Sequence, residues 1–461
     1  MRHQTDRASL TFMDETLANF CRMRVPRYTS YPTAPHFESA FSPDRYNEWL
    51  HGIDPSTRIS LYIHVPFCRA LCHYCGCNTK VANRDSPIIS YAGLLEREIE
   101  MVANAIGRRQ PVAHIHWGGG TPGILPSENF HAINDAIHDR FDLSDIREHA
   151  IEIDPRYVDK PFVARLVDAG INRVSLGVQD FSPTVQKLIG RVQPVGVVAQ
   201  ATQRLRSAGI EAINFDLMYG LPGQTVHSVE RSVEISLTME PSRVAYFGYA
   251  HVPWAKKNQV LIDETTLPGP EERFEQAQRA AEVLKKRGYV RIGFDHYARP
   301  DDPMVTALTD GGIARNFQGY TDDAGDALIG LGASAIGKLP SGYAQNAPGV
   351  PEYRAAIEAG QFATVRGKAL SADDKARGAV IEQLMCSMSV NVGAVAGHYQ
   401  VATDSLRPNS ETLKVLEDVG FLVRDGVQLN ITDRGRPFAR IAASAFDAYL
   451  SESDAKYSEA I

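Results

Sequence analysis

The sequence predicts an α/β fold in which strands alternate with helices. Three segments, 162–178, 201–220 and 280–297, each predict an amphipathic helix that ends at a glycine and is followed by an apolar strand. A glycine supplies the left-handed residue that commonly ends a helix. Because strands that alternate with helices form parallel βαβ units, we expect residues 56–340 to form an open or closed barrel. Periodicity alone leaves a doubly wound sheet as the alternative.

The rest of this region fits the same alternation. Between strands expected at 59–65 and 112–117, apolar residues recur every three to four positions, as on one face of a helix: Leu95, Ile99, Val102 and Ile106. Further apolar strands are expected at 149–154 and 243–249.

The pattern changes near residue 370, where helices and one hairpin are expected. Ser371 and Asp374 have the spacing of a capping box, and Asp425-Gly426 stands between alternating apolar residues as in a hairpin turn. Helix, hairpin and helix in this order resemble a winged helix, which often binds DNA. Residues 411–420 carry more acidic than basic side chains, so we expect a structural flank instead.

Composition and charge restrict the class of protein. The chain has 461 residues, of which 44% are hydrophobic and 22% charged, as in a soluble protein of more than one domain. Residues 1–20 lack the apolar core of a signal peptide, and no run approaches the roughly 18 apolar residues of a membrane span. The net charge of −7 argues against general nucleic-acid binding. We therefore expect a cytoplasmic monomer without a nucleic-acid or membrane partner.

Four of the six cysteines lie in one short segment: Cys68, Cys72, Cys75 and Cys77. A reducing cytosol opposes disulfides between them. Zinc sites usually take their cysteines from two separated pairs, so this single group favours zinc less, although zinc stays open. Three thiolates in a tight loop after a strand suit a [4Fe–4S] cluster, whose fourth iron is then open to a substrate or cofactor.

Two motifs carry a resemblance to a known superfamily. The C-x3-C-x2-C pattern after "YIHVPF" (62–67) resembles the signature of the radical SAM superfamily, in which the open iron binds S-adenosylmethionine (SAM). "GGGTP" (118–122) is similar to its glycine-rich SAM motif, where a backbone without Cβ lets the methionyl group lie close.

A closer resemblance extends over residues 20–450. Cys77 and the segments 27–37, 315–321, 330–337 and 431–450 resemble the oxygen-independent coproporphyrinogen III oxidase (dehydrogenase) family. The resemblance implies a partial (β/α)6 radical SAM barrel with an N-terminal extension and a mostly helical C-terminal domain. The expected boundaries are 1–55 for the extension, 56–365 for the catalytic barrel and 366–461 for the C-terminal, winged-helix-like domain.

The resemblance also implies cofactor sites. Cys68, Cys72 and Cys75 match the cluster ligands. Positions that match contacts of a first SAM on the open iron are Tyr62, Gly119, Glu152 and Ile336. Positions that match contacts of a second SAM are Tyr74, Gly120, Thr121, Gln179, Arg191, Asp216 and Ala250. Cys77 is expected beside the cofactors without ligating iron.

The residues themselves agree with this placement. Four of them follow or end separate expected strands, where barrel enzymes build their sites: Glu152, Gln179, Asp216 and Ala250. A carboxylate at such a position suits the ammonium group of SAM or a ribose hydroxyl. Taken singly, Glu152 and Asp216 are also explained as strand-end caps, Gln179 as a core amide and Arg191 as a surface residue of a helix.

The resemblance implies conversion of coproporphyrinogen III to protoporphyrinogen IX in haem biosynthesis without O2. A 5′-deoxyadenosyl radical from SAM takes a hydrogen from each of two propionates, which then lose CO2. The cluster needs an electron donor whose identity the sequence does not indicate. Arg27 and Arg315 are candidates for the substrate carboxylates, or else surface arginines. The alternative function is that of a radical-SAM-like haem-binding chaperone.

Overall fold

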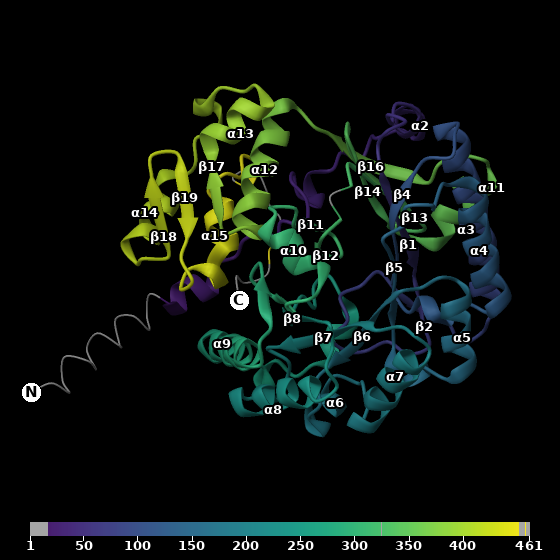
Figure 1. Ribbon diagram of the computed structural model, residues 1–461, viewed down its shortest axis with the longest axis horizontal. Helices are drawn as coiled ribbons and strands as arrows, with labels where there is room; N and C mark the ends of the chain where they lie inside the picture. The colour runs from purple at the N-terminus through teal and green to yellow at the C-terminus, as the bar shows by residue number, and fades with distance from the viewer. Residues whose placement is uncertain (1–16, 324, 451–456, 458–461) are drawn as a thin grey trace, which may run out of the picture.

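The computed structural model describes residues 17–323, 325–450 and 457. Within them, one twelve-stranded sheet has the order β16-β15-β14-β13-β1-β4-β5-β6-β7-β8-β10-β9. Figure 1 shows this sheet and its helices beside the C-terminal helices, which lie at the upper left with a small sheet of their own. Residues 1–16 of the expected extension and 451–456 and 458–461 of the expected C-terminal domain lie outside the described residues.

Six parallel strands form the centre of the sheet: β1 (Ile59–Val65), β4 (Val112–Gly119), β5 (Glu148–Ile153), β6 (Arg173–Gln179), β7 (Ala212–Tyr219) and β8 (Arg243–Gly248). They lie side by side in chain order. A doubly wound sheet reverses its strand order at one point, and these six strands do not. The partial (β/α)6 barrel is therefore confirmed, and the doubly wound alternative is wrong.

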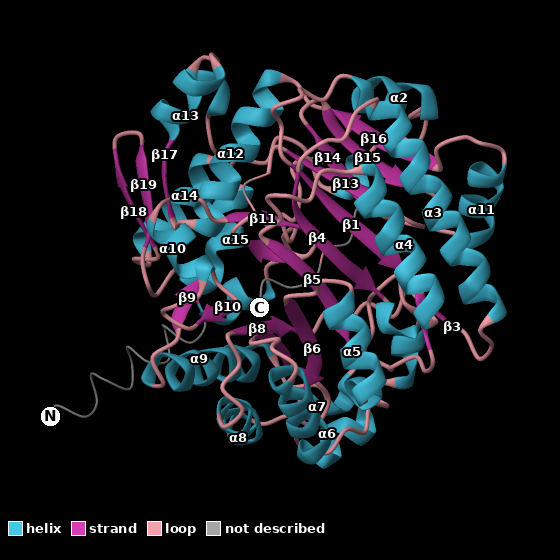
Figure 2. Cartoon of the chain, turned by 45° about the vertical axis from the view of Figure 1, so that its right-hand side comes forward, coloured by secondary structure: helices cyan, strands magenta, loops and turns pink. Residues whose placement is uncertain are grey.

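Helices connect these strands and cover one face of the sheet (Figure 2). They are α3 (Ser86–Ile106), α4 (Ser127–Arg140), α5 (Lys160–Asp168), α6 (Pro183–Leu188), α7 (Val195–Ser207) and α8 (Val226–Leu237), and α9 (Pro270–Lys286) follows the last of the six strands. The four residues of α3 that the sequence places on one apolar face are all buried. Gly170, Gly209 and Gly288 follow their helices with φ of 75°, 91° and 86°, which confirms the left-handed helix ends.

The outer strands of the sheet depart from the parallel pattern. β9 (Val290–Ile292) and β10 (His296–Ala298) pair antiparallel, and β10 pairs antiparallel with β8. The expectation that segment 280–297 continues the parallel units is therefore wrong, because the chain turns back directly after β9 instead of crossing through another helix. At the other side β13 (Ala327–Leu331) runs parallel to β1, and three antiparallel strands follow: β14 (Ile336–Leu339), β15 (Gly342–Asn346) and β16 (Thr364–Ala369).

Shorter elements lie around the sheet. They are α2 (Pro43–His51), β2 (Phe67–Cys68), β3 (Lys80–Val81), α10 (Pro303–Thr309), β11 (Ala314–Asn316), β12 (Gly319–Thr321) and α11 (Val350–Glu358). No helix in the described part of the chain is long and apolar enough to cross a membrane.

The C-terminal part is mostly helical, as expected. It contains α12 (Ala372–Cys386), β17 (Ser389–Asn391), α13 (Val392–Tyr399), α14 (Ser410–Asp418), β18 (Leu422–Asp425), β19 (Gln428–Ile431) and α15 (Ala439–Ser444). Ser371 and Asp374 form the predicted capping box. The predicted hairpin joins β18 and β19, with Asp425 opposite Gln428. N-terminal side chains, including Phe20 and Tyr31, belong to the hydrophobic core of this part, so the chain's beginning packs against its end.

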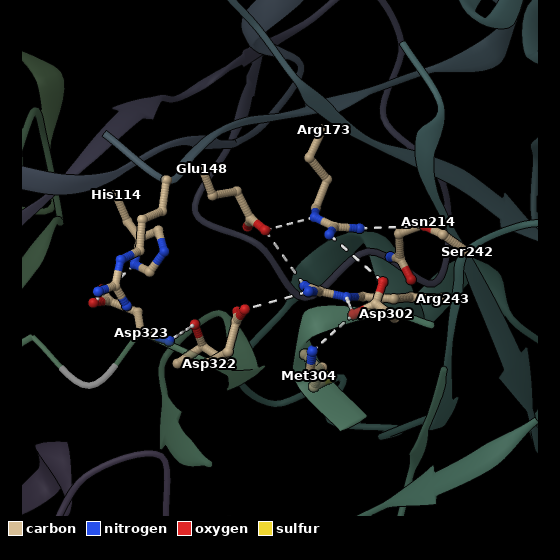
Figure 3. Close-up of polar contacts among 12 residues, drawn as sticks. His114, Glu148, Arg173, Asn214, Ser242, Arg243, Asp302, Met304, Asp322 and Asp323 are labelled. Carbon is tan, nitrogen blue, oxygen red and sulfur yellow. Dashed lines mark hydrogen bonds and ion pairs between the residues drawn. The ribbon is translucent and has the colours of Figure 1, made fainter. Parts of the chain in front are cut away.

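A buried ion network lies at the amino ends of the parallel strands (Figure 3). Arg173 Nε lies 2.6 Å from Glu148 Oε2, and Arg243 Nε lies 2.8 Å from Asp302 Oδ1. Glu148, Arg173 and Arg243 are the first residues of three strands, β5, β6 and β8. Because the cysteine loop follows the last residue of β1, this network lies at the opposite end of the barrel from that loop.

Candidate functional site

The cysteine loop lies at the carboxyl end of the parallel strands. A two-residue parallel pair between β2 and β3 closes it. The backbone N–H of Gly120 donates to Val65 O at 2.9 Å, and that of Thr121 donates to Phe67 O at 2.8 Å. These bonds tie the loop to the glycine segment after β4. The two motifs that are separated in the sequence therefore form one site.

Hydrogen-bond donors lie next to two of the thiols. Cys68 Sγ is 3.3 Å from Thr79 Oγ1 and 3.4 Å from Thr121 Oγ1, and Cys72 Sγ is 3.6 Å from Arg191 Nη1. Burial raises the pKa of Cys68, while the two threonine hydroxyls lower it. Donors to sulfur stabilise iron-bound thiolates, so these residues fit a [4Fe–4S] cluster. No three His, Cys, Asp or Glu side chains among the described residues gather as ligands of a single metal ion.

Cys75 and Cys77 contact each other. The hydrogen bond between their side chains lowers the pKa of Cys75 to about 6 and raises that of Cys77. Lys256 Nζ donates to Cys77 O at 3.1 Å. Cys77 is exposed to solvent, and the charge of Glu152 also raises the pKa of its thiol. The fourth cysteine thus lies between the loop and the carboxylate of β5.

The two glycines that end β4 are required by the chain's own side chains. A Cβ on Gly119 would lie 2.5 Å from the His64 ring, and one on Gly118 would lie 2.9 Å from Glu152 Oε1. Gly119 also has a φ of 108°, which a residue with a Cβ rarely adopts. Close packing against β1 and β5 is therefore one reason for these glycines, and contact with a methionyl group stays a prediction.

Glu152 is held by two donors on β4. His116 Nε2 lies 3.1 Å from Glu152 Oε1, and the Gly119 N–H donates to Oε2 at 3.3 Å. Loss of hydration would raise the pKa of Glu152, but the hydrogen bond and charge of His116 hold it below its usual value. The side chain is 38% exposed. It is therefore an ionised carboxylate that a cationic ligand can reach.

Two histidines beside this carboxylate were not anticipated from the sequence. His116 contacts Glu152, and His64 Nδ1 lies 3.0 Å from Tyr62 OH while its Nε2 lies 3.0 Å from Asn78 O. Desolvation lowers the pKa of His64. Both histidines stand two residues from another polar or aromatic residue of the same strand, so strand alternation was the signal that could have found them.

Arg191 joins the cysteine loop to two further strands. Its Nη1 lies 3.1 Å from Asp154 Oδ2, and its Nη2 donates to Gly177 O at 2.8 Å. Burial opposes its charge, but Tyr74 and Asp154 raise the pKa of Arg191. Gln179 lies beside it with a φ of 65°, a left-handed conformation that is uncommon for a residue with a side chain. Such backbone outliers cluster at functional sites.

Asp216 lies inside β7 and not at its end. It pairs with Gly177 and Ala245 in the sheet, so the expectation of a strand-end position is wrong for this residue. Ser175 Oγ donates to its Oδ2 at 2.8 Å, and Asn214 Nδ2 donates to Oδ1 at 2.8 Å. Loss of hydration raises the pKa of Asp216 to about 6.

A segment after β8 holds the cysteine loop in place. Asn258 Nδ2 lies 3.1, 3.0 and 2.9 Å from the carbonyl oxygens of Cys72, His73 and Cys75. Gln259 Nε2 donates to the carbonyl oxygens of Tyr74 at 2.8 Å and Ala250 at 3.2 Å. These two amides thus join two of the predicted contact residues, Tyr74 and Ala250. No periodicity or motif marks Asn258 or Gln259, and the sequence did not indicate them.

Ile336 and the two candidate arginines lie on other elements. Ile336 packs over Gly330, which is the partner of Tyr62 in the sheet. Arg27 donates from Nη2 to Gly248 O at 3.4 Å. Arg315 Nη1 lies 3.9 Å from Asp295 Oδ1. Within the described part of the chain, neither arginine forms a hydrogen bond or ion pair with a cysteine of the loop.

The comparisons with known proteins agree with this fold and site. A model of the radical SAM superfamily matches residues 62–235. The oxygen-independent coproporphyrinogen III oxidase of Bradyrhizobium diazoefficiens is 44% identical, over 95% of this chain and 97% of that protein. The oxidase of the same name from Paracoccus denitrificans is 43% identical, over 92% and 94%. The solved structure of Escherichia coli coproporphyrinogen III oxidase, described as a radical SAM enzyme, is 33% identical, covers 93% of this chain and 100% of that chain, and gives a TM-score of 0.88.

The partial barrel and its three-cysteine loop are those of a radical SAM protein, a class that uses a [4Fe–4S] cluster and SAM. Identity of 40% or more to several relatives extends over nearly the whole length. The chain belongs to the oxygen-independent coproporphyrinogen III oxidase family.

Proposed function

We propose that this chain is the enzyme that converts coproporphyrinogen III to protoporphyrinogen IX without O2 in haem biosynthesis. The observation that carries the proposal is the three-cysteine loop beside the ionised Glu152 at the carboxyl end of the barrel, in a chain of this family. When bound, the cluster and SAM together supply a radical that removes a hydrogen atom from the substrate. The protein supplies binding, orientation and a site shielded from water.

Cys68, Cys72 and Cys75 hold the cluster in this proposal. The hydroxyls of Thr79 and Thr121 and the guanidinium of Arg191 lie against two of these sulfurs and stabilise their negative charge. Asn258 holds the carbonyl groups on both sides of the loop, which fixes the directions in which the thiols point.

A first SAM binds beside Tyr62, Gly119, Glu152 and Ile336. Its ammonium group requires an ionised carboxylate with a free lone pair, and Glu152 meets this requirement because His116 keeps its pKa low. The hydrogen bond between Tyr62 OH and His64 Nδ1 fixes the two rings beside each other on β1. Cys77 lies next to this group without ligating iron.

We also propose a second SAM, beside the set Tyr74, Gly120, Thr121, Gln179, Arg191, Asp216 and Ala250. What supports it is a second charged side chain at this end of the barrel, Arg191, which pairs with Asp154 and not with Glu152. Arg191 suits a carboxylate, and Asp216, with a pKa raised to about 6, suits a hydroxyl or an ammonium. Two decarboxylations of one substrate require two equivalents of SAM, so two sites allow both without exchange.

The substrate carboxylates meet Arg27 and Arg315. Both guanidiniums lie near one carboxylate, Asp295, which also contacts His296 at 2.6 Å, so positive charge is in excess there. Nε of Arg315 is buried and has no hydrogen-bond partner among the described residues. Arg315 also lines a cavity of about 450 Å³ whose wall includes Lys338. A propionate would supply the acceptor that this arginine lacks.

We further propose the domain boundaries 1–55, 56–365 and 366–461 and a cytoplasmic, monomeric enzyme. The large sheet ends with β16 at Ala369, and α12 begins at Ala372. The reduced thiols that a cluster needs support a reducing compartment.

The proposal is tested by the iron and sulfide content of protein purified without oxygen. Cys68→Ser, Cys72→Ser and Cys75→Ser each remove one of three thiolates, so we expect each variant to lose the cluster and SAM cleavage. Cys386→Ser, in the C-terminal part, is the control and is expected to keep both. Full iron and sulfide in any one of the three loop variants would contradict the assignment of ligands.

A further inference from the structure

Next to the cysteine loop lies an exposed apolar surface, here called the loop face: Leu71, Leu188, Val192, Trp254, Val260 and Leu261. Their exposed fractions run from 36% for Leu188 to 68% for Val260. Together with Val81 and Val195, they are eight of the sixteen large apolar side chains that stay exposed in the described residues. All eight lie on the segments 69–84, 187–195 and 254–262. Single exposed apolar residues are ordinary, whereas such a concentration marks an interaction surface.

Hydrogen bonds and packing join the three segments into one surface. The backbone N–H of His73 donates to Ile189 O at 2.9 Å, and Asn258 Nδ2 donates to His73 O at 3.0 Å. Ile262 and Ile189 belong to the same small hydrophobic cluster. The loop face is therefore continuous with the loop that holds the thiols.

The three segments that carry the loop face are basic, although the chain is acidic overall. The three segments contain seven basic residues and no Asp or Glu: Arg69, Lys80, Arg84, Lys187, Arg191, Lys256 and Lys257. Of these, Arg191 is buried in the site. Acidic residues begin just outside, where Asp85 pairs with Arg69 and Glu264 pairs with His251, and Asp263 is exposed. In a chain of net charge −7, this local excess of lysine favours an acidic partner.

We propose that the loop face docks a small acidic protein that carries a one-electron donor. This inference rests on the proposed function, because it requires a cluster in the loop. In the docked complex the donor is oxidised by one electron and the cluster is reduced by one, and no atom is transferred. Apolar side chains at the centre with lysines around them match the anatomy of small, transient interfaces. Lys256 and Asn258 contact loop carbonyls directly, so a partner seated here lies close to the thiols.

The test uses holoenzyme purified without oxygen and a reduced acidic flavodoxin as the probe, mixed rapidly while oxidation of the flavin is followed. Two variants, Lys257→Glu and Val260→Glu, change exposed residues of segment 254–262 and are called the loop-face variants: Val260 belongs to the loop face, and Lys257 lies on the same segment. Lys414→Glu and Val423→Glu make the same changes at exposed positions of the C-terminal part. Dithionite, a small reductant that needs no docking surface, is the reference in every variant.

We expect both loop-face variants to accept electrons from flavodoxin about tenfold more slowly or worse at low ionic strength. Added salt should reduce the difference in electron-transfer rate between Lys257→Glu and the unchanged protein. The control variants, and the reaction of all variants with dithionite, should match the unchanged protein. Wild-type rates with flavodoxin in both loop-face variants would overturn the proposal. A dimer that Val260→Glu converts to monomer would overturn it too, because the face would then bind a second copy. Failure of dithionite to reduce the unchanged protein would instead contradict the proposed function.

Discussion

Nη1 of Arg191 lies 3.6 Å from Sγ of Cys72 and also 3.1 Å from Asp154 Oδ2. One guanidinium thus connects a thiol of the cysteine loop to a buried carboxylate at the end of β5. The contact couples the charge of the loop to the strands of the barrel, and it can be tested apart from catalysis.

We expect Arg191→Leu to retain iron but to lower the reduction potential of the cluster. A cationic hydrogen-bond donor to a ligand sulfur favours the more negative, reduced state, and its removal takes this effect away. A redox titration followed by electron paramagnetic resonance measures the potential. Arg156→Leu is the matched control, since Arg156 pairs with the same Asp154 at 2.6 Å and acts on Cys72 through its charge, without a hydrogen bond to the thiol. Equal potentials in the two variants would show that the hydrogen bond to Cys72 adds nothing beyond the effect of a nearby charge.

Glu152→Gln should weaken SAM binding and leave iron content unchanged. A charge-assisted hydrogen bond to an ammonium contributes about 1.5–3 kcal/mol, so we expect the affinity to fall roughly tenfold or more. Equilibrium dialysis with labelled SAM gives the dissociation constant. Glu100→Gln, an exposed change on α3, serves as the control. SAM bound with undiminished affinity would return Glu152 to a purely structural role beside His116.

Cys77→Ser should keep a normal [4Fe–4S] spectrum while losing most product formation. Only one residue separates Cys77 from Cys75, so the two thiols are poorly placed to reach different corners of one cluster, and a fourth ligand would close the iron that SAM needs. The contact between the two side chains leaves Cys77 beside Cys75, the proposed ligand. The comparison is iron per chain in Cys77→Ser against Cys75→Ser. Equal loss of iron from both would make Cys77 a ligand.

Glu98 should make stability depend on pH near neutrality. It is buried on α3 and accepts hydrogen bonds from Gly332 N at 2.6 Å, Asn346 Nδ2 at 2.6 Å and Tyr353 OH at 2.7 Å. Burial raises its pKa from 4.5 to about 7. Because the folded pKa lies above the unfolded one, the protonated group favours folding below about pH 4.5. This contribution, on the order of 3 kcal/mol, is lost as the pH rises through about 7.

The measurement is the unfolding temperature of Glu98→Gln and of the unchanged protein at about pH 5 and about pH 8. We expect the variant to be less stable than the unchanged protein at the lower pH, because an amide hydrogen then faces one of the three donors. We also expect its unfolding temperature to fall less than that of the unchanged protein between the two pH values. The same fall in unfolding temperature in both proteins would show that Glu98 does not cause the pH dependence of stability.

Local patterns in the sequence predicted the parts of the fold that local physics decides. The glycine after α5, α7 and α9 and the capping box at Ser371 depend on the backbone of a few residues, and these predictions are confirmed. The direction of β9 and β10 depends on which strand the chain meets after a turn of three residues. That is a tertiary choice, and periodicity could not indicate it.

The site was foreseen where its residues stand in a motif or end a strand. The spaced cysteines of the loop and Glu152 are such residues. Asn258 and Gln259 act through long-range bonds to carbonyl groups some 185 positions away in the chain, and a side-chain amide in a loop gives no signal of its own. The sequence predicts a strand end at Asp216 because it gives no signal for the end of β7, and the strand continues to Tyr219.

The central claim is tested most directly by an anaerobic assay of the purified holoenzyme with coproporphyrinogen III, SAM and a reductant. The account predicts protoporphyrinogen IX, release of CO2 and 5′-deoxyadenosine, and a tricarboxylate seen in passing between the two decarboxylations. The result that would contradict it is tight binding of haem by a protein that, with its cluster intact, never decarboxylates the porphyrinogen. The haem-chaperone alternative would then hold.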